Sequence, residues 1–281
     1  MGGIIDRIKN VFRASTKRDF DSLVGKDGKE ELRIVRRLDS DLASKEPEAR
    51  RRAARLMAAT RLRPATYYLA KYIADPDPAV SKACRDGLVA IGGPSVGQSL
   101  VMHCFDRKPN AMRRAAMDVF QLLHIKGEFE DESQSRSVGK FTLLSGDPIA
   151  QEASALLASM GRHGGPGLLV GALETTDVDH QARAIAKVAE AKYYRGTREL
   201  LERFLVEPKG DPAASRLHDA ASEAIRSMGE PAVRYLVDAL GGAAGRGAAR
   251  VASKITGLSI TPDDHQLLRD WWEAHQPKDV R

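Results

Sequence analysis

Apolar and polar residues along the chain alternate with the period of an amphipathic α-helix. In the segment 77–105 the apolar residues of the first half recur every three or four positions: Val80, Cys84, Leu88 and Ile91. Runs in which β-branched and aromatic residues alternate with polar ones, which would predict strands, are nearly absent. The pattern therefore predicts an all-α protein.

The same segment carries the residues that start and stop helices. Asp77 and Pro78 open it, and an aspartate that caps a helix is often followed by proline in the first turn, where the missing N–H costs nothing. Gly92 and Gly93 then end the first helix, because glycine accepts the left-handed conformation of a helix C-terminus. Segment 77–105 is thus expected to form one helical hairpin.

The hairpin pattern returns along the chain, with clear copies from Asp147 and Asp211 and degenerate copies between them. A small residue in the middle of each first helix marks the repeats: Ala53, Cys84, Ala116, Ala153, Ala184, Ala221 and Ala248. A repeat of 27 to 37 residues is typical of solenoids. A small side chain there lets neighbouring first helices approach closely. About seven hairpins are predicted.

These repeats resemble HEAT repeats of the bacterial short-hairpin type, also found in HEAT-like proteins of the PBS-lyase type. That pattern reads D-x-x-[VA]-R-x-x-A-x-x-A-L-x-x-[IM]-G, followed by a second helix that starts with proline. The resemblance covers residues 46–275 and implies a right-handed α-solenoid. HEAT arrays serve mostly as protein-binding scaffolds, but some bind nucleic acid and some are bilin-lyase-like enzymes, so the fold alone does not decide the function.

The resemblance weakens around Ala116, where residues 124–127 replace the glycine turn and the polar stretch EFEDESQSRS follows. We expect this stretch to be a loop that leads into a second helix.

Two segments are expected, residues 1–45 with N-terminal amphipathic and capping helices, and residues 46–281 with the HEAT-like solenoid. Within the first, a helix is predicted near residues 28–44. At the other end, Thr261 and Pro262 are expected to open a C-terminal capping helix, in which Trp271 and Trp272 close the core.

The extreme N-terminus has an amphipathic pattern of its own. Apolar residues fall on one helical stripe, surrounded by basic residues: Ile4, Ile5, Ile8, Val11 and Phe12. A basic amphipathic helix can lie in a membrane interface. Docking onto the body of the solenoid is the favoured explanation of the stripe, and binding in a partner's groove is a third.

The search for catalytic chemistry is negative. The seven histidines and two cysteines lack metal-ligand spacing. The glycine-rich segment from Gly241 lacks the Lys-Ser or Lys-Thr of a phosphate loop, so this segment is interpreted as an inter-repeat turn. Cys84 and Cys104 are expected to be small buried hydrophobic residues. We therefore expect no enzyme activity, no metal and no cofactor. Cytoplasmic localisation is expected, with peripheral membrane contact left open.

Charge is unevenly distributed. Of the formal net charge of +6, all arises in residues 1–75, which hold 18 Lys and Arg against 11 Asp and Glu. Helical spacing groups six arginines into a predicted basic patch: Arg33, Arg36, Arg37, Arg51, Arg52 and Arg55. Such a patch can bind nucleic acid or anionic membrane, or can be a plain solvated surface.

Together these features predict a non-catalytic scaffold or adaptor that binds a protein partner along a concave face formed by the second helices. Exposed positions on those helices are the candidate contacts: Tyr67, Lys71, Gln98, His103, Arg198, Arg203 and Arg234. The alternative is electrostatic binding of nucleic acid or anionic membrane through the basic N-terminal segment. No small-molecule substrate is indicated.

Overall fold

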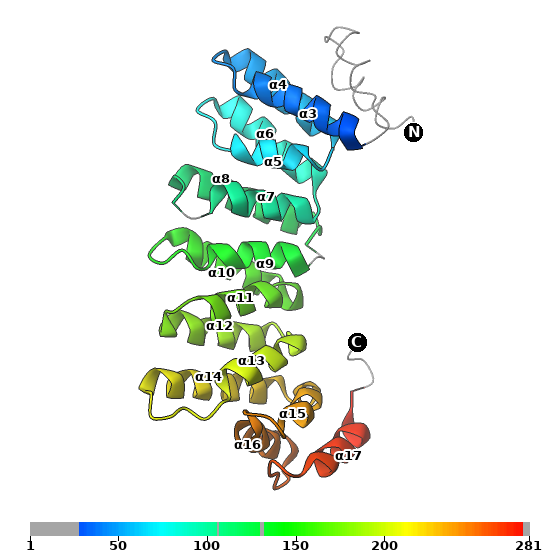
Figure 1. The fold of residues 1–281 in the computed structure, drawn as a ribbon, viewed down its shortest axis with the longest axis vertical. Helices are drawn as coiled ribbons and strands as arrows, with labels where there is room; N and C mark the ends of the chain where they lie inside the picture. Colours follow the sequence, from blue (N-terminus) through cyan, green and yellow to red (C-terminus); the bar gives the residue numbers. More distant parts are fainter. Residues whose placement is uncertain (1–27, 106, 130–131, 278–281) are drawn as a thin grey trace. The chain divides into compact units, whose positions relative to one another are not determined.

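The computed structural model describes residues 28–105, 107–129 and 132–277. These residues form fifteen α-helices and no strand, which confirms the all-α prediction (Figure 1). The chain divides into two compact units, residues 1–141 and 142–281, and each is described by itself. The predicted amphipathic helix at residues 4–12 lies outside the described residues.

Unit 1 contains one leading helix, α3, and three helical hairpins. Their bounds are α3 Gly28–Leu42, α4 Pro47–Thr60, α5 Ala65–Lys71, α6 Pro78–Ile91, α7 Pro94–Cys104, α8 Asn110–Ile125 and α9 Glu132–Phe141. The first helices α4, α6 and α8 pack on one another in sequence, and so do the second helices α5, α7 and α9 (Figure 1). Each hairpin thus adds one helix to each of two layers.

Unit 2 contains four more hairpins. Their bounds are α10 Pro148–Ser159, α11 Gly165–Glu174, α12 Val178–Glu190, α13 Thr197–Phe204, α14 Pro212–Met228, α15 Val233–Ala239, α16 Gly245–Thr256 and α17 His265–His275. Short 3-10 turns, η1 Gly161–His163, η2 Tyr194–Gly196 and η3 Glu230–Ala232, precede three of the second helices. The described part of the chain thus contains seven hairpins, which agrees with the sequence prediction.

Aspartate side chains cap the repeats as predicted. The Asp77 Oδ1 accepts hydrogen bonds from the backbone N–H groups of Ala79 and Val80, at 2.8 and 3.2 Å. Asp147 and Asp211 each accept one such bond, at 2.9 Å, from the residue two positions on. These bonds satisfy N–H groups that have no partner inside the helix, so the Asp-Pro signal fixes where each helix begins.

The small residues that marked the repeats lie in the core. All seven are buried, and the most exposed of them, Ala184, shows 6% of its surface. Close approach of first helices is visible at Gly87 of α6, where a Cβ atom would lie 2.7 Å from the Cβ of Ala58 on α4. The stacking therefore depends on small side chains at the contact between helices.

The polar stretch after α8 is not the predicted loop. Residues 132–141 form α9, in which the buried Ser135 and Ser137 donate hydrogen bonds to the carbonyl oxygens of Glu132 and Ser133, at 3.0 and 2.9 Å. A Cβ at Gly97 of α7 would lie 2.8 Å from the Ser137 Oγ. Small serines that bond to their own helix can pack this tightly, and tertiary packing overrides the polar sequence.

The C-terminal helix also differs from its prediction. It begins at His265, because the Asp264 carboxylate accepts hydrogen bonds from the Thr261 N–H and hydroxyl at 2.7 and 2.6 Å and so holds a turn ahead of the helix. Leu268 is the buried residue of α17, whereas Trp271 and Trp272 are only half-buried. Leu268, rather than the tryptophan pair, closes this end of the core.

Candidate interaction surface

The second helices α5 and α7 of unit 1 pack side by side in parallel register. A buried hydrogen bond of 2.9 Å joins the hydroxyls of Thr66 and Ser99, which are 33 residues apart. On the outward side the rings of Tyr67 and His103 meet edge to face, with centroids 4.3 Å apart and planes at 75°. The structure thus brings together two predicted contact residues from successive repeats.

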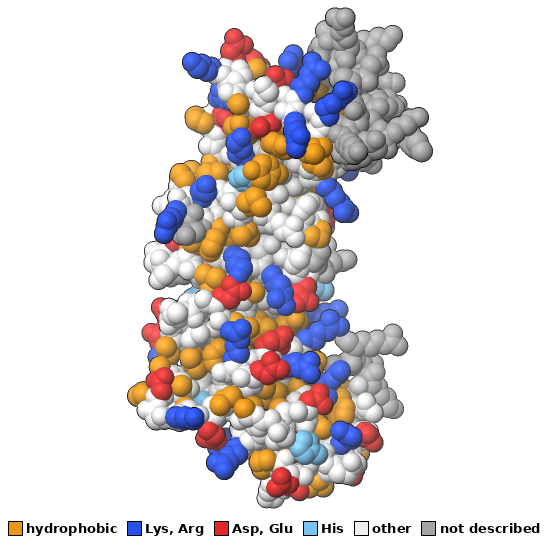
Figure 2. All heavy atoms as spheres, viewed as in Figure 1, with side chains coloured by type: hydrophobic (Ala, Val, Ile, Leu, Met, Phe, Trp, Pro, Cys, Tyr) orange, Lys and Arg blue, Asp and Glu red, His pale blue; other side chains and the backbone are white. Residues whose placement is uncertain are grey.

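Apolar side chains are exposed at this place. Tyr67 shows 43% of its surface and Met102, which lies one helical turn beyond the exposed Gln98, shows 64%. Figure 2 shows hydrophobic side chains gathered over α5 and α7. Sequence reasoning missed Met102, although its spacing from Gln98 places both on one side of α7. We use the name α5–α7 patch for the surface formed by five residues: Tyr67, Lys71, Gln98, Met102 and His103.

Lys71 gives the patch a positive charge at its edge. The Lys71 Nζ lies 3.5 Å from the Asp39 Oδ1 of α3 and 5.0 Å from the centre of the Tyr72 ring. Burial lowers the pKa of Lys71, but its contacts with Tyr72 and Asp39 outweigh burial, so the pKa is raised overall. Lys71 therefore carries a full positive charge at neutral pH.

The pKa of the His103 imidazole is lowered, which favours its neutral form. Burial is the largest cause that lowers its pKa, and the positive charges of Lys108 and Lys71 lower it further. The ring nitrogen Nε2 is buried without a hydrogen-bond partner. His103 is therefore best described as a neutral ring that supports Tyr67, with two cations within electrostatic reach.

The three candidate contacts in unit 2 are exposed arginines that interact within that unit. Arg198 lies 3.7 Å from Glu202 on the same helix, and Arg203 donates to the carbonyl oxygen of Leu173 at 3.3 Å. The Arg234 guanidinium lies 5.0 Å from the centre of the Tyr235 ring. All three arginines lie exposed on second helices. The exposed large apolar side chains in the described part of unit 2 are Val206 and Leu267, at 40% and 44%.

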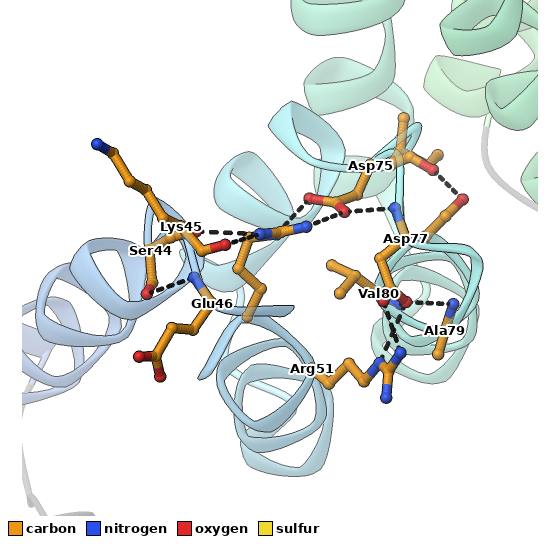
Figure 3. A network of polar contacts seen from close by, with 11 residues as sticks. Ser44, Lys45, Glu46, Arg51, Asp75, Asp77, Ala79 and Val80 are labelled. Atoms are coloured by element: carbon orange, nitrogen blue, oxygen red, sulfur yellow. Dashed lines mark hydrogen bonds and ion pairs between the residues drawn. The ribbon is translucent and has the colours of Figure 1, made fainter. Parts of the chain in front are cut away.

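The predicted basic patch is divided by the structure. Arg33, Arg36 and Arg37 are exposed on α3, and Arg52 and Arg55 are exposed on α4. Arg51 instead donates two hydrogen bonds to the Asp77 carboxylate, at 3.1 and 2.6 Å (Figure 3). It also pairs with Glu48. Five of the six arginines thus point to solvent, while Arg51 joins two repeats.

A neighbouring arginine that sequence reasoning missed makes a second junction. Arg50 donates to both oxygens of Asp75, at 2.9 and 3.0 Å, and to the carbonyl oxygens of Ser44 and Lys45 (Figure 3). An Arg-Arg pair followed about 25 residues later by Asp-x-Asp was the available sequence signal. Similar inter-repeat pairs join Arg85 to Asp118 and Arg216 to Asp179.

The glycine-rich segment after α15 serves close packing. A Cβ at Gly247 would lie 2.6 Å from the carbonyl oxygen of Leu205, so only glycine fits. A shallow hollow of about 420 Å³ lies beside it, and its walls include Arg246 and His265.

Across the ranges that the structure describes, no group of three or more His, Cys, Asp or Glu side chains is arranged to hold a metal ion. In those ranges no helix is long and apolar enough to span a bilayer.

Comparison with known proteins supports the repeat architecture. Residues 38–120 match the family described as HEAT repeats. Among solved structures, the chain is similar to human deoxyhypusine hydroxylase in complex with glycerol, with 14% sequence identity over 97% of this chain and 99% of that chain. The TM-score of that match is 0.31, which is too low to carry an argument about this chain. No curated protein matches the sequence.

Proposed function

Since residues 38–120 are HEAT repeats, we propose that this chain is a non-catalytic scaffold or adaptor that binds a protein partner along its second-helix face. HEAT repeats commonly serve as protein-interaction scaffolds. Their helices stack into extended surfaces whose exposed positions are free to vary, because the core is filled by the small and aliphatic positions of each repeat.

The exposure of Tyr67 and Met102 on adjacent second helices is the observation that carries this proposal. Tyrosine and methionine are enriched in the buried centres of protein interfaces and are unfavourable to leave in water. The rest of the α5–α7 patch supplies polar groups around this apolar centre, as the rim of an interface does. The patch is therefore the first place where we expect a partner to make contact.

The test is affinity capture from a native lysate, at low and moderate salt, with mass spectrometry of the bound proteins. The intact chain is compared with the variant Tyr67→Ser/Met102→Ser. A matched control is Leu122→Ser/Ile125→Ser on the first helix α8, where the side chains show 42% and 79% of their surface. We expect a defined partner that survives moderate salt, is lost with the first variant and is retained by the control. Equal capture by all three proteins would contradict the proposal.

A second candidate function is electrostatic binding of nucleic acid or anionic membrane. The exposure of Arg36, Arg37, Arg52 and Arg55 favours it, and Figure 2 shows basic side chains gathered over α3 and α4. Its signature would be capture of nucleic acid or anionic vesicles that falls steeply as salt rises. Replacement of these four arginines by glutamine should then abolish capture. Arg51 is left out because its replacement would break the junction with Asp77.

A further inference from the structure

We propose that the α5–α7 patch binds a partner segment in which an apolar side chain is flanked by Asp or Glu residues. The apolar side chain would cover Tyr67 and Met102, and the carboxylates would pair with Lys71 and Lys108. This inference rests on the proposed function and adds the chemistry of the partner.

The apolar centre is already held in position. The Tyr67 ring meets the Tyr68 ring at 5.1 Å between centroids and 79°, and the His103 ring at 4.3 Å and 75°. A ring fixed by two edge contacts loses little conformational freedom when a partner binds, so more of the gain from burial remains as affinity. Met102, which is more exposed and flexible, can adapt to the shape of the entering side chain.

Two cations stand beside this centre. Lys71 lies at the end of α5 and Lys108 just beyond α7, and the charges of both act on the His103 ring. The Lys71 side chain shows 44% of its surface, and its contact with Asp39 is long, at 3.5 Å, so its ammonium group has donors left for a second carboxylate. Lys108 is exposed.

The arrangement suits an acidic peptide better than a nucleic acid. A nucleic-acid strand carries one phosphate per nucleotide and needs a continuous row of cations. Here the two lysines border an apolar centre. Single-stranded bases also need aromatic faces to stack on, whereas Tyr67 is partly covered by its neighbours and Met102 offers no ring.

The test is fluorescence anisotropy of the full chain with two labelled helical peptides. One places a central leucine between glutamates on the same helical face, and the other has lysine in place of each glutamate. We expect the glutamate peptide to bind more tightly. Lys71→Glu/Lys108→Glu should weaken its binding about fivefold and reverse the preference, because exposed ion pairs contribute modestly and additively. Tyr67→Ser should weaken it about tenfold or more, as loss of an interface anchor does.

A matched control is Lys82→Glu/Lys187→Glu, which makes the same charge change on the first helices α6 and α12 and should leave the preference unchanged. Circular dichroism checks that each variant is folded. The inference is overturned if the glutamate peptide does not bind, if the preference survives the reversal at Lys71 and Lys108, or if a single-stranded oligonucleotide binds more tightly through the same residues. One outcome would overturn this inference alone and leave the proposed function standing. In that outcome Tyr67→Ser/Met102→Ser loses capture of the partner, whereas Lys71→Glu/Lys108→Glu retains it.

Discussion

Arg51 donates two hydrogen bonds to the carboxylate of Asp77, at 3.1 and 2.6 Å, while the same carboxylate caps α6 (Figure 3). The Asp77 side chain thus accepts hydrogen bonds from N–H groups at the start of α6 and also joins α6 to the preceding first helix, α4. The hydrogen bonds from Arg51 are the largest cause that lowers the pKa of Asp77, to about 2. The junction between these repeats therefore depends on an ionised carboxylate.

The contribution of Asp77 to stability should depend on pH. Its pKa is lowered from 3.8 to about 2 in the folded chain, so the stabilisation is complete above the unfolded value and is lost as pH falls from about 4 towards 2. Urea unfolding over a pH series should show Asp77→Asn less stable than the wild type at neutral pH, with the difference shrinking in that window. Asp86→Asn, which removes an exposed partner of Lys82, is the control and should change little. A difference for Asp77→Asn that does not vary with pH would contradict the prediction.

Gly87→Ala should destabilise the chain although alanine favours helices. Its Cβ would lie 2.7 Å from the Ala58 Cβ and 3.0 Å from the Leu69 Cδ1. Such overpacking costs about 1–3 kcal/mol in the free energy of unfolding, against a gain in helix propensity of about 1 kcal/mol.

A double-mutant cycle with Ala58→Gly should show partial rescue, because that change removes the closest atom. Ala59→Gly, on the next position of α4, is the control and should give additive effects. If the Ala58 pair is also additive, close packing is not the reason for the glycine.

Both cysteines should be unreactive in the native chain. Cys84 and Cys104 have no exposed surface, and burial raises the pKa of each thiol to about 12. Since the thiolate is the reactive form, a thiol reagent such as DTNB at mildly alkaline pH should react only after denaturant is added, and then with both residues. Rapid reaction without denaturant would show that one of the two helices opens.

The C-terminal end of unit 2 should depend on Leu268 more than on the tryptophans. Leu268 has no exposed surface, so Leu268→Ala should cost about 2–5 kcal/mol in the free energy of unfolding. Trp272→Ala should cost less, because that side chain is half-buried. Denaturant unfolding of the two variants compares them directly. A larger loss for Trp272→Ala would restore the tryptophans as the closing residues.

The local sequence was sufficient to predict the hairpins. Asp-Pro starts, glycine turns and a small residue at each first-helix contact act within a few residues of one another, and the structure places Asp77, Asp147 and Asp211 at helix starts as expected. The serine-rich first half of α9 escaped prediction, because its serines bond to their own helix and pack closely against Gly97 instead of showing an apolar pattern.

The side-chain pairings required the tertiary structure. Helical periodicity alone allows Arg51 to be a solvated cation or the partner of Asp77. It likewise allows the Tyr67 ring to be exposed without a neighbour or to pack against the His103 ring. These choices depend on the lateral register between helices whose residues lie 26 to 36 positions apart, as in the pairs Arg51–Asp77 and Tyr67–His103. That register is set when the helices pack, since the small residues at each contact decide how closely and at which height two repeats meet.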